Sequence, residues 1–222
     1  MQTRQSPNWN PPRADQRVYQ SFEFRADATM ELIDALSSNT TARSVVELSL
    51  SPYFHRHYSS VNDAIDKFFH ASQHSEVERR QKEREMMRIV GSVLEPPQSR
   101  KFWLFGMDAT PLPRRFANTL SDRGFVHQPN TLRGNKPVTI GHQYSHMAFL
   151  PEKTAASSPP WIVPLLVRRI TTQETETQVG AEQVATLMSD KTLSFHEDLC
   201  VQVEDSRYST PQFLSQVGKH DN

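Results

Sequence analysis

The 222-residue sequence has one cysteine, seven glycines and no excess of charge of either sign. The single Cys200 excludes an internal disulfide framework and a cysteine-based zinc site, and its apolar neighbours predict a buried thiol. The 25 basic and 25 acidic residues cancel, so only local patches, not bulk charge, can support nucleic-acid binding.

Long apolar runs and nucleotide-binding motifs are also missing. No run approaches the roughly 18 apolar residues of a membrane span, and the first residues contain no apolar signal segment. We therefore expect no membrane partner and a cytoplasmic location. The motifs GxxxxGK[ST], GxSxG, HExxH and GxGxxG do not occur, which argues against a nucleotide cofactor and the common hydrolase classes.

Proline is frequent, with 15 residues, and the segment EPPQS at 95–99 is the clearest linker. Residues 1–20 are polar and predict a disordered tail. Residues 21–98 predict an all-helical region that contacts DNA or another subunit, with helices starting near Asp27, Thr41, Ser60 and Ser75.

Residues 99–222 show the pattern of a mixed α/β layer. Apolar runs predict strands at 101–107, 138–150, 161–170 and 199–204, and amphipathic segments predict helices at 180–190 and from 209. The predicted order is β–β–β–α–β–α.

Two aspartates follow apolar runs and predict carboxylates at strand ends. Asp108 ends KFWLFGMD, and Asp205 ends LCVQVED, where Val201, Val203 and Asp205 share one face of the predicted strand. If these strands are parallel neighbours, both carboxylates emerge at one sheet edge. Paired carboxylates can hold the divalent ions that phosphodiester transfer requires. The alternative is that each Asp caps the turn that follows it.

Basic side chains follow both aspartates and can neutralise DNA phosphates. The alternative for them is an ordinary solvated surface. They are Arg114, Arg115, Arg123, Arg133 and Lys136 after Asp108, and Arg207 after Asp205.

Several long segments, in order, resemble the catalytic domain of bacterial insertion-sequence transposases of the DDE superfamily. They are FGMDATPLPRRFANTLSDRGFVHQPN, GNKPVTIGHQYS and VEDSRYSTP. The upstream segment LSPYFHRHYSSVNDAI resembles the helical N-terminal part of the same proteins, and the resemblance covers residues 25–222.

The resemblance implies a ribonuclease-H-like fold in which three acidic residues hold two Mg²⁺ or Mn²⁺ ions. Asp108 would be the first acid and Asp205 the second. His142, Gln143 and Tyr144 would line the cleft, although a structural role in the sheet is at least as compatible. The implied partners are double-stranded DNA at the element ends and in the target, and a second copy of the protein.

The sequence departs from the family pattern after Asp205. No Glu follows, and Asp221, the second-last residue, is a poor substitute. We therefore expect the N-terminal portion of a transposase, with an incomplete sheet and little or no strand transfer. The alternatives are a non-catalytic DNA-binding or subunit-pairing fragment that interferes with full-length transposase, and an unrelated α/β protein.

Overall fold

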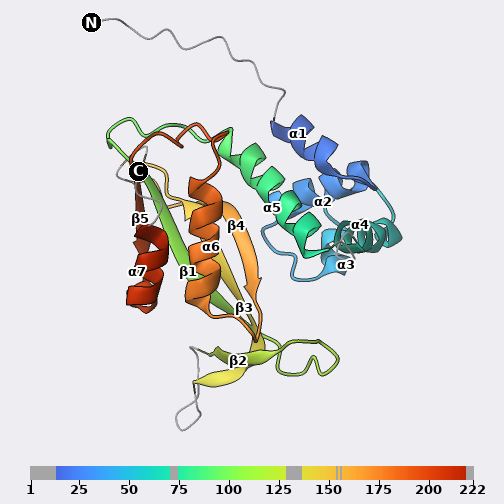
Figure 1. Cartoon of the computed structure of the whole chain (residues 1–222). Coiled ribbons are helices and arrows are strands. Elements are labelled where there is room, and N and C mark those ends of the chain that lie inside the picture. Colours follow the sequence, from blue (N-terminus) through green and yellow to red (C-terminus); the bar gives the residue numbers. More distant parts are fainter. Residues whose placement is uncertain (1–13, 71–74, 129–136, 154, 156, 219–222) are drawn as a thin grey trace, which may run out of the picture. The chain divides into compact units, whose positions relative to one another are not determined.

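The computed structural model describes residues 14–70, 75–128, 137–153, 155 and 157–218. The chain divides into two compact units, Met1–Val93 and Leu94–Asn222 (Figure 1). Within the described part of the chain, no helix is long and apolar enough to cross a membrane.

The first unit contains helices and no strand among its described residues. Its helices are α1 (Ala14–Ser21), α2 (Ala26–Ser37), α3 (Val45–Leu48), α4 (Tyr58–His70) and α5 (Glu76–Gly91). Apolar side chains spaced along these helices meet in a small core that contains Leu32, Ala35, Phe54 and Val61.

Helix α1 corrects the prediction of a disordered tail over residues 1–20, of which residues 1–13 lie outside the described part. Two hydrogen bonds within the unit attach α1. Arg17 Nη1 donates to Ser92 Oγ at 2.6 Å, and the Tyr19 hydroxyl donates to Asp27 Oδ1 at 2.8 Å. The first of these bonds joins residues 75 positions apart, which a reading of local polarity cannot detect.

Helix starts also differ from those predicted. Asp27 lies in the first turn of α2 and does not cap it, because Arg25 occupies the cap position in a left-handed conformation. Ser44, not Thr41, caps α3 through the Glu47 N–H. The start near Ser75 is correct: Ser75 and Glu78 form a reciprocal capping box at α5.

The second unit is a five-stranded mixed sheet with helices, and this confirms the predicted mixed α/β class. The strands are β1 (Trp103–Pro113), β2 (Gly124–His127), β3 (Val138–Phe149), β4 (Val163–Ile170) and β5 (Cys200–Glu204). Their order is β2-β3-β1-β5, with β4 also paired to β3. Only the β1–β5 pair is parallel among the described strands. The arrangement is consistent with a ribonuclease-H-like DDE fold.

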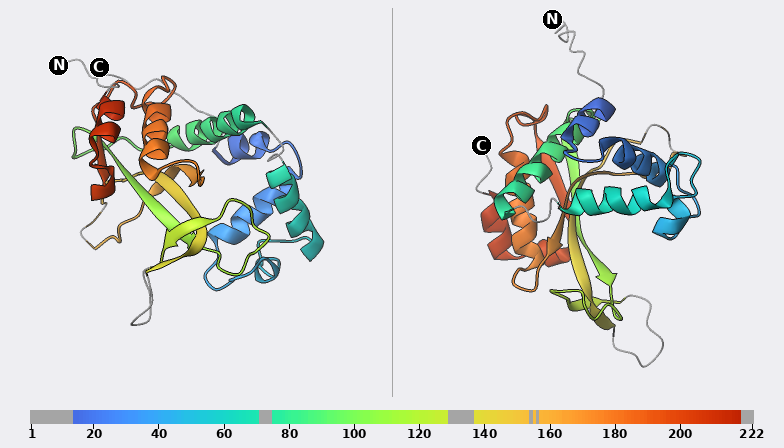
Figure 2. Two further views of the ribbon diagram at one scale, coloured as in Figure 1. Left: turned by 60° about the horizontal axis from the view of Figure 1, so that its bottom comes forward. Right: turned by 90° about the vertical axis from the view of Figure 1, so that its right-hand side faces the viewer.

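Three helical segments complete this unit: α6 (Glu176–Met188), the short 3₁₀ helix η2 (Ser206–Tyr208) and α7 (Pro211–Val217). Helices α6 and α7 lie on one face of the sheet (Figure 2). Trp103 and Phe105 are 3% and 0% exposed and pack against the ring of Phe195 at centroid distances of 5.0 and 5.1 Å. This aromatic contact anchors the N-terminal half of β1.

The structure differs from the expected element order in having β2. This strand has only four residues, and its Phe125 is 82% exposed, so it lacks the apolar run by which the longer strands are recognised. Helix α6 begins at Glu176 rather than near residue 180, because Thr175 and Gln178 form a capping box there.

Candidate active site

Asp108 and Asp205 occupy equivalent positions on the two parallel strands. In the β1–β5 register Met107 is opposite Glu204, and each aspartate is the next residue along its strand. The two strands are therefore parallel neighbours, which is the condition on which the meeting of the two carboxylates depended. Because β5 ends at Glu204, Asp205 is the first residue after its strand.

Asp108, by contrast, lies inside β1 and not at its end. β1 continues to Pro113 because it stays paired with β3, up to the pair Pro113–Gly141. The apolar face predicted for Asp205 is also not a buried one, since Val203 on the edge strand β5 is 52% exposed. Asp108 thus marks the point at which β1 loses one of its two neighbours.

A single open pocket of about 390 Å³ contains both carboxylates. It extends from the end of β5 and the adjacent middle of β1 to the β2–β3 hairpin. Its lining residues are Asp108, Ala109, Pro111, Phe125, Val126, His127, Pro137, Val138, Gln143, Glu176, Asp205 and Arg207.

Each aspartate holds a local backbone hydrogen bond through one carboxylate oxygen. Asp108 Oδ1 accepts the Ala109 N–H at 2.8 Å, and Asp205 Oδ1 accepts the Arg207 N–H at 2.6 Å. The second bond makes Asp205 the cap of η2, so the turn-cap interpretation is correct for one of its carboxylate oxygens, Oδ1. Among the described residues, neither carboxylate forms an ion pair, and neither Oδ2 atom accepts a hydrogen bond.

Glu176 is a third carboxylate in the pocket, and sequence reasoning missed it. It is the first residue of α6, and its Oε2 accepts a hydrogen bond from Gln143 Nε2 at 2.9 Å and lies 3.5 Å from Arg207 Nη1. The sequence does indicate that α6 starts at Glu176, because Thr175 and Gln178 have the spacing of a capping box. With the helix start predicted at residue 180, Glu176 fell in the preceding loop.

The charges of all three carboxylates affect the pKa of the Tyr208 hydroxyl. Burial raises this pKa to about 12, and the charges of Glu176, Asp108 and Asp205 contribute to the increase. Burial likewise raises the pKa of Glu204 to about 7. The charges of Glu176, Asp108 and Asp205 thus reach the buried Tyr208 hydroxyl.

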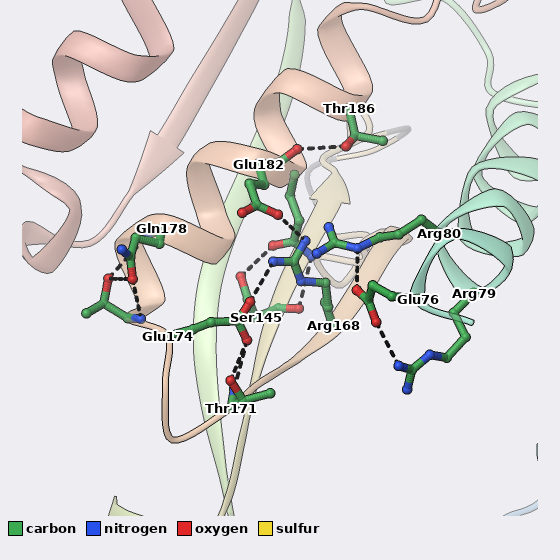
Figure 3. A network of polar contacts seen from close by, with 12 residues as sticks. Glu76, Arg79, Arg80, Ser145, Arg168, Thr171, Glu174, Gln178, Glu182 and Thr186 are labelled. Atoms are coloured by element: carbon green, nitrogen blue, oxygen red, sulfur yellow. Dashed lines mark hydrogen bonds and ion pairs between the residues drawn. The ribbon is translucent and has the colours of Figure 1, made fainter. Parts of the chain in front are cut away.

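A polar network fixes the start of α6 relative to the sheet (Figure 3). Arg168 on β4 is paired with Glu182 at 2.8 Å and Glu174 at 3.2 Å, and Glu174 accepts hydrogen bonds from the backbone and hydroxyl of Thr171. These bonds hold both the first turns of α6 and the loop before it. Glu176 consequently projects from a fixed position.

A family model for DDE superfamily endonucleases matches residues 17–220. The chain belongs to the DDE superfamily. No curated protein matches it. Membership indicates a nuclease or transposase type of activity on DNA, and endonucleases of this superfamily generally use divalent metal ions.

The two aspartates suit such an ion in their chemistry. Mg²⁺ prefers oxygen ligands, and its sites often use one or two carboxylates with solvent and substrate oxygens in the remaining positions. Both carboxylates border one pocket and have an Oδ2 atom that accepts no hydrogen bond from a described residue. The described residues contain no group of three or more His, Cys, Asp or Glu side chains that could hold a metal ion.

Among the predicted DNA-contacting residues, Arg207 lines the pocket. Arg114, Arg115 and Arg123 do not line it. Arg123 Nη1 donates to the carbonyl of Arg114 at 3.0 Å, and the Arg115 guanidinium lies 5.7 Å from the ring centroid of Phe116. Arg133 and Lys136 lie outside the described residues, as does Asp221.

Of the three residues expected to line the cleft, Gln143 lines this pocket, and His142 and Tyr144 do not. His142 is 7% exposed, its Nε2 lies 3.0 Å from the Ser121 carbonyl oxygen, and its ring meets Tyr144 edge-on at 6.4 Å. Side chains alternate along a strand, so Gln143 between them takes the opposite face and reaches Glu176.

Proposed function

We propose that the second unit is a metal-dependent DNA-cleaving core in which Asp108 and Asp205 hold Mg²⁺ or Mn²⁺. The observation that carries the proposal is the equivalent position of the two aspartates on parallel strands β1 and β5, beside one pocket. A dyad built on a paired sheet is rigid, which suits a site whose ligands must be held in fixed positions.

The residues around the dyad have distinct roles in this proposal. Backbone N–H groups orient each carboxylate and leave Oδ2 directed to a ligand. Glu176 orients Arg207, whose guanidinium contacts a DNA phosphate at the pocket. When bound, divalent ions activate the attacking oxygen and stabilise the leaving oxygen of a phosphodiester.

The substrate we propose is double-stranded DNA at insertion-sequence ends. The reaction implied by the resemblance is cleavage there and transfer of the freed strand to target DNA, of which we expect this protein to perform little or no strand transfer. Membership of the superfamily and the resemblance of the segments around Asp108 and Asp205 support this substrate. Arg114, Arg115, Arg123, Arg133 and Lys136 stay candidate phosphate contacts, and a homo-oligomer in the bacterial cytoplasm, associated with the nucleoid, is the proposed setting.

Metal binding and cleavage test the proposal together. We expect Mn²⁺ titration to show binding to the wild type, and Asp108→Asn or Asp205→Asn to weaken it at least about tenfold. Cleavage of DNA that carries the element ends should fall with metal affinity. Glu197→Gln is the control, because its side chain is 86% exposed and outside the pocket. Equal metal affinity in all four proteins would refute the proposal.

A second candidate is a non-catalytic DNA-binding or subunit-pairing protein that interferes with a complete transposase. The observation in its favour is that the described residues offer a dyad and no three-residue metal cluster. This function predicts salt-dependent DNA binding that survives Asp108→Asn, with no cleavage in Mg²⁺ or Mn²⁺. Products that depend on Asp108 would exclude it.

A further inference from the structure

The β2–β3 hairpin presents exposed apolar side chains at the edge of the dyad pocket. Phe125 on β2 is 82% exposed and Val138 on β3 is 48% exposed, and both line the pocket that contains Asp108 and Asp205. Phe125 also lines a neighbouring pocket with Gly124 and Thr172, so it forms the ridge between the two. The exposed Phe125 ring is therefore accessible to a ligand of this pocket.

The short strand β2 is built to hold this residue outward. Val126 is 5% exposed and anchors the strand, so its neighbour Phe125 projects to the opposite face. The register places Phe125 opposite Ile140, which is itself 40% exposed. Truncating the Phe125 ring therefore removes little buried contact.

The base of the hairpin is fixed against β1. A Cβ atom at Gly141 would lie 2.3 Å from the Leu112 carbonyl oxygen, so the two strands approach here more closely than any side chain allows. The Arg114 N–H donates to the Ile140 carbonyl oxygen at 2.9 Å. Phe125 is thus held relative to the strand that carries Asp108.

We propose that Phe125 stacks on an unpaired base of the DNA strand whose phosphate lies at Asp108 and Asp205. This inference rests on the proposed function. A nucleotide has an anionic phosphate and a flat apolar base, and the pocket offers a carboxylate dyad for metal-bridged phosphate together with an exposed ring. Aromatic stacking accepts any base, because every base has a π-face.

A second copy of this chain is the other occupant to consider for an exposed aromatic patch. The centre of the pocket argues against it, because the ionic pair of Glu176 and Arg207 lies there beside two further carboxylates. Charged residues are depleted from the cores of protein–protein interfaces. A phosphate-bearing ligand is the better match to these groups.

The test compares two DNA probes without element ends by fluorescence anisotropy in buffer that contains Mn²⁺, since the phosphate contact at the two aspartates is proposed to be metal-bridged. One is a short duplex with an unpaired 2-aminopurine at the end of one strand, and the other is the same duplex fully paired. We expect Phe125→Ala to weaken binding of the unpaired probe about 5- to 150-fold and to leave the paired probe unchanged. Phe125→Trp should restore binding and quench the 2-aminopurine.

Trp161→Ala is the matched control, since Trp161 is 57% exposed, lies in the same unit and does not line the pocket. It should bind both probes as the wild type does. Equal losses on both probes, no loss on either, or a wild type that does not distinguish the probes would overturn the inference. So would a dimer, seen by size-exclusion chromatography, that Phe125→Ala dissociates without changing DNA binding.

Failure of the inference differs from failure of the proposed function. If cleavage depends on Asp108 while Phe125→Ala binds and cleaves as the wild type, only the stacking role fails. If Phe125→Ala loses the unpaired probe while Mn²⁺ affinity is unaffected by Asp108→Asn, only the metal-dependent function fails.

Discussion

Replacing Gly180 by alanine tests how tightly α6 holds the residues beside the dyad. A Cβ atom at this position would lie 2.8 Å from Tyr208 Cε1 and 2.9 Å from both Cε and Sδ of Met107. Tyr208 is 1% exposed and packs edge-on against Phe213 at a centroid distance of 5.3 Å. The ring therefore cannot move without displacing a second buried ring.

Two effects of opposite sign set the magnitude. Overpacking a buried position costs about 1–3 kcal/mol. Alanine gains about 1 kcal/mol over glycine inside a helix. Because the flexible end of Met107 can give way but Tyr208 cannot, we expect Gly180→Ala to lower the free energy of unfolding by about 1 kcal/mol.

The sign should reverse when the obstructing ring is removed. In a Tyr208→Ala background the Cβ atom gains room, so Gly180→Ala should raise the free energy of unfolding by up to about 1 kcal/mol. Urea unfolding followed by Trp103 fluorescence measures both differences, since this indole is 3% exposed in the same unit. A stabilising Gly180→Ala in the otherwise wild-type protein would refute the rigid packing of Tyr208 against α6.

Three further predictions concern single side chains. Hydrogen bonds from Thr172, and to a smaller extent nearby positive charge, lower the pKa of Asp122. The ionised Asp122 therefore stabilises the fold above its unfolded pKa, and this stability is lost as the pH falls through its folded pKa. In urea titrations Asp122→Asn should reduce this loss of stability in acid, and an unchanged pH dependence would contradict the prediction. Burial raises the pKa of Cys200 to about 11. Iodoacetamide at about pH 8.5 should therefore modify the native thiol roughly a hundredfold more slowly than the urea-unfolded thiol. Equal rates in the two states would show that the thiol is not buried. Asp205 caps η2 by accepting the Arg207 N–H. Asp205→Ala should therefore lower the free energy of unfolding by about 1 kcal/mol in urea titrations, whereas Asp205→Asn keeps the cap. Equal losses in the two variants would contradict the capping role.

The class of fold and the dyad could be predicted because both leave local signals. The apolar run at 101–107 identifies the buried part of β1, and the resemblance of the segments around Asp108 and Asp205 identifies the superfamily. The parallel pairing of β1 with β5 could be stated only as a condition, since residues so far apart are joined by hydrogen bonds that no local pattern records.

The rest of the site depends on contacts that the sequence does not display. Glu176 enters the pocket because α6 starts four residues before the predicted point and because Gln143 reaches it from β3. His142 resembles a cleft residue by its segment, but the alternation of β3 turns it toward Ser121 instead. Strand alternation was available as a rule, yet it could not be applied without knowing which face α6 covers.

The pocket exists because β1 and β5 differ in length. Past Met107 and Glu204, β1 continues beside β3, whereas the chain after β5 turns away into η2. Asp205 makes that turn by capping η2, and the same turn places the Arg207 guanidinium near Glu176. The vacated side of β1 is bordered by Asp108 and, further along, by the hairpin that carries Phe125. Asp205 thus follows the last residue of β5, makes the turn that leaves the pocket beside β1, and contributes a carboxylate to that pocket. For this reason the turn-cap and metal-ligand interpretations of Asp205 are not exclusive.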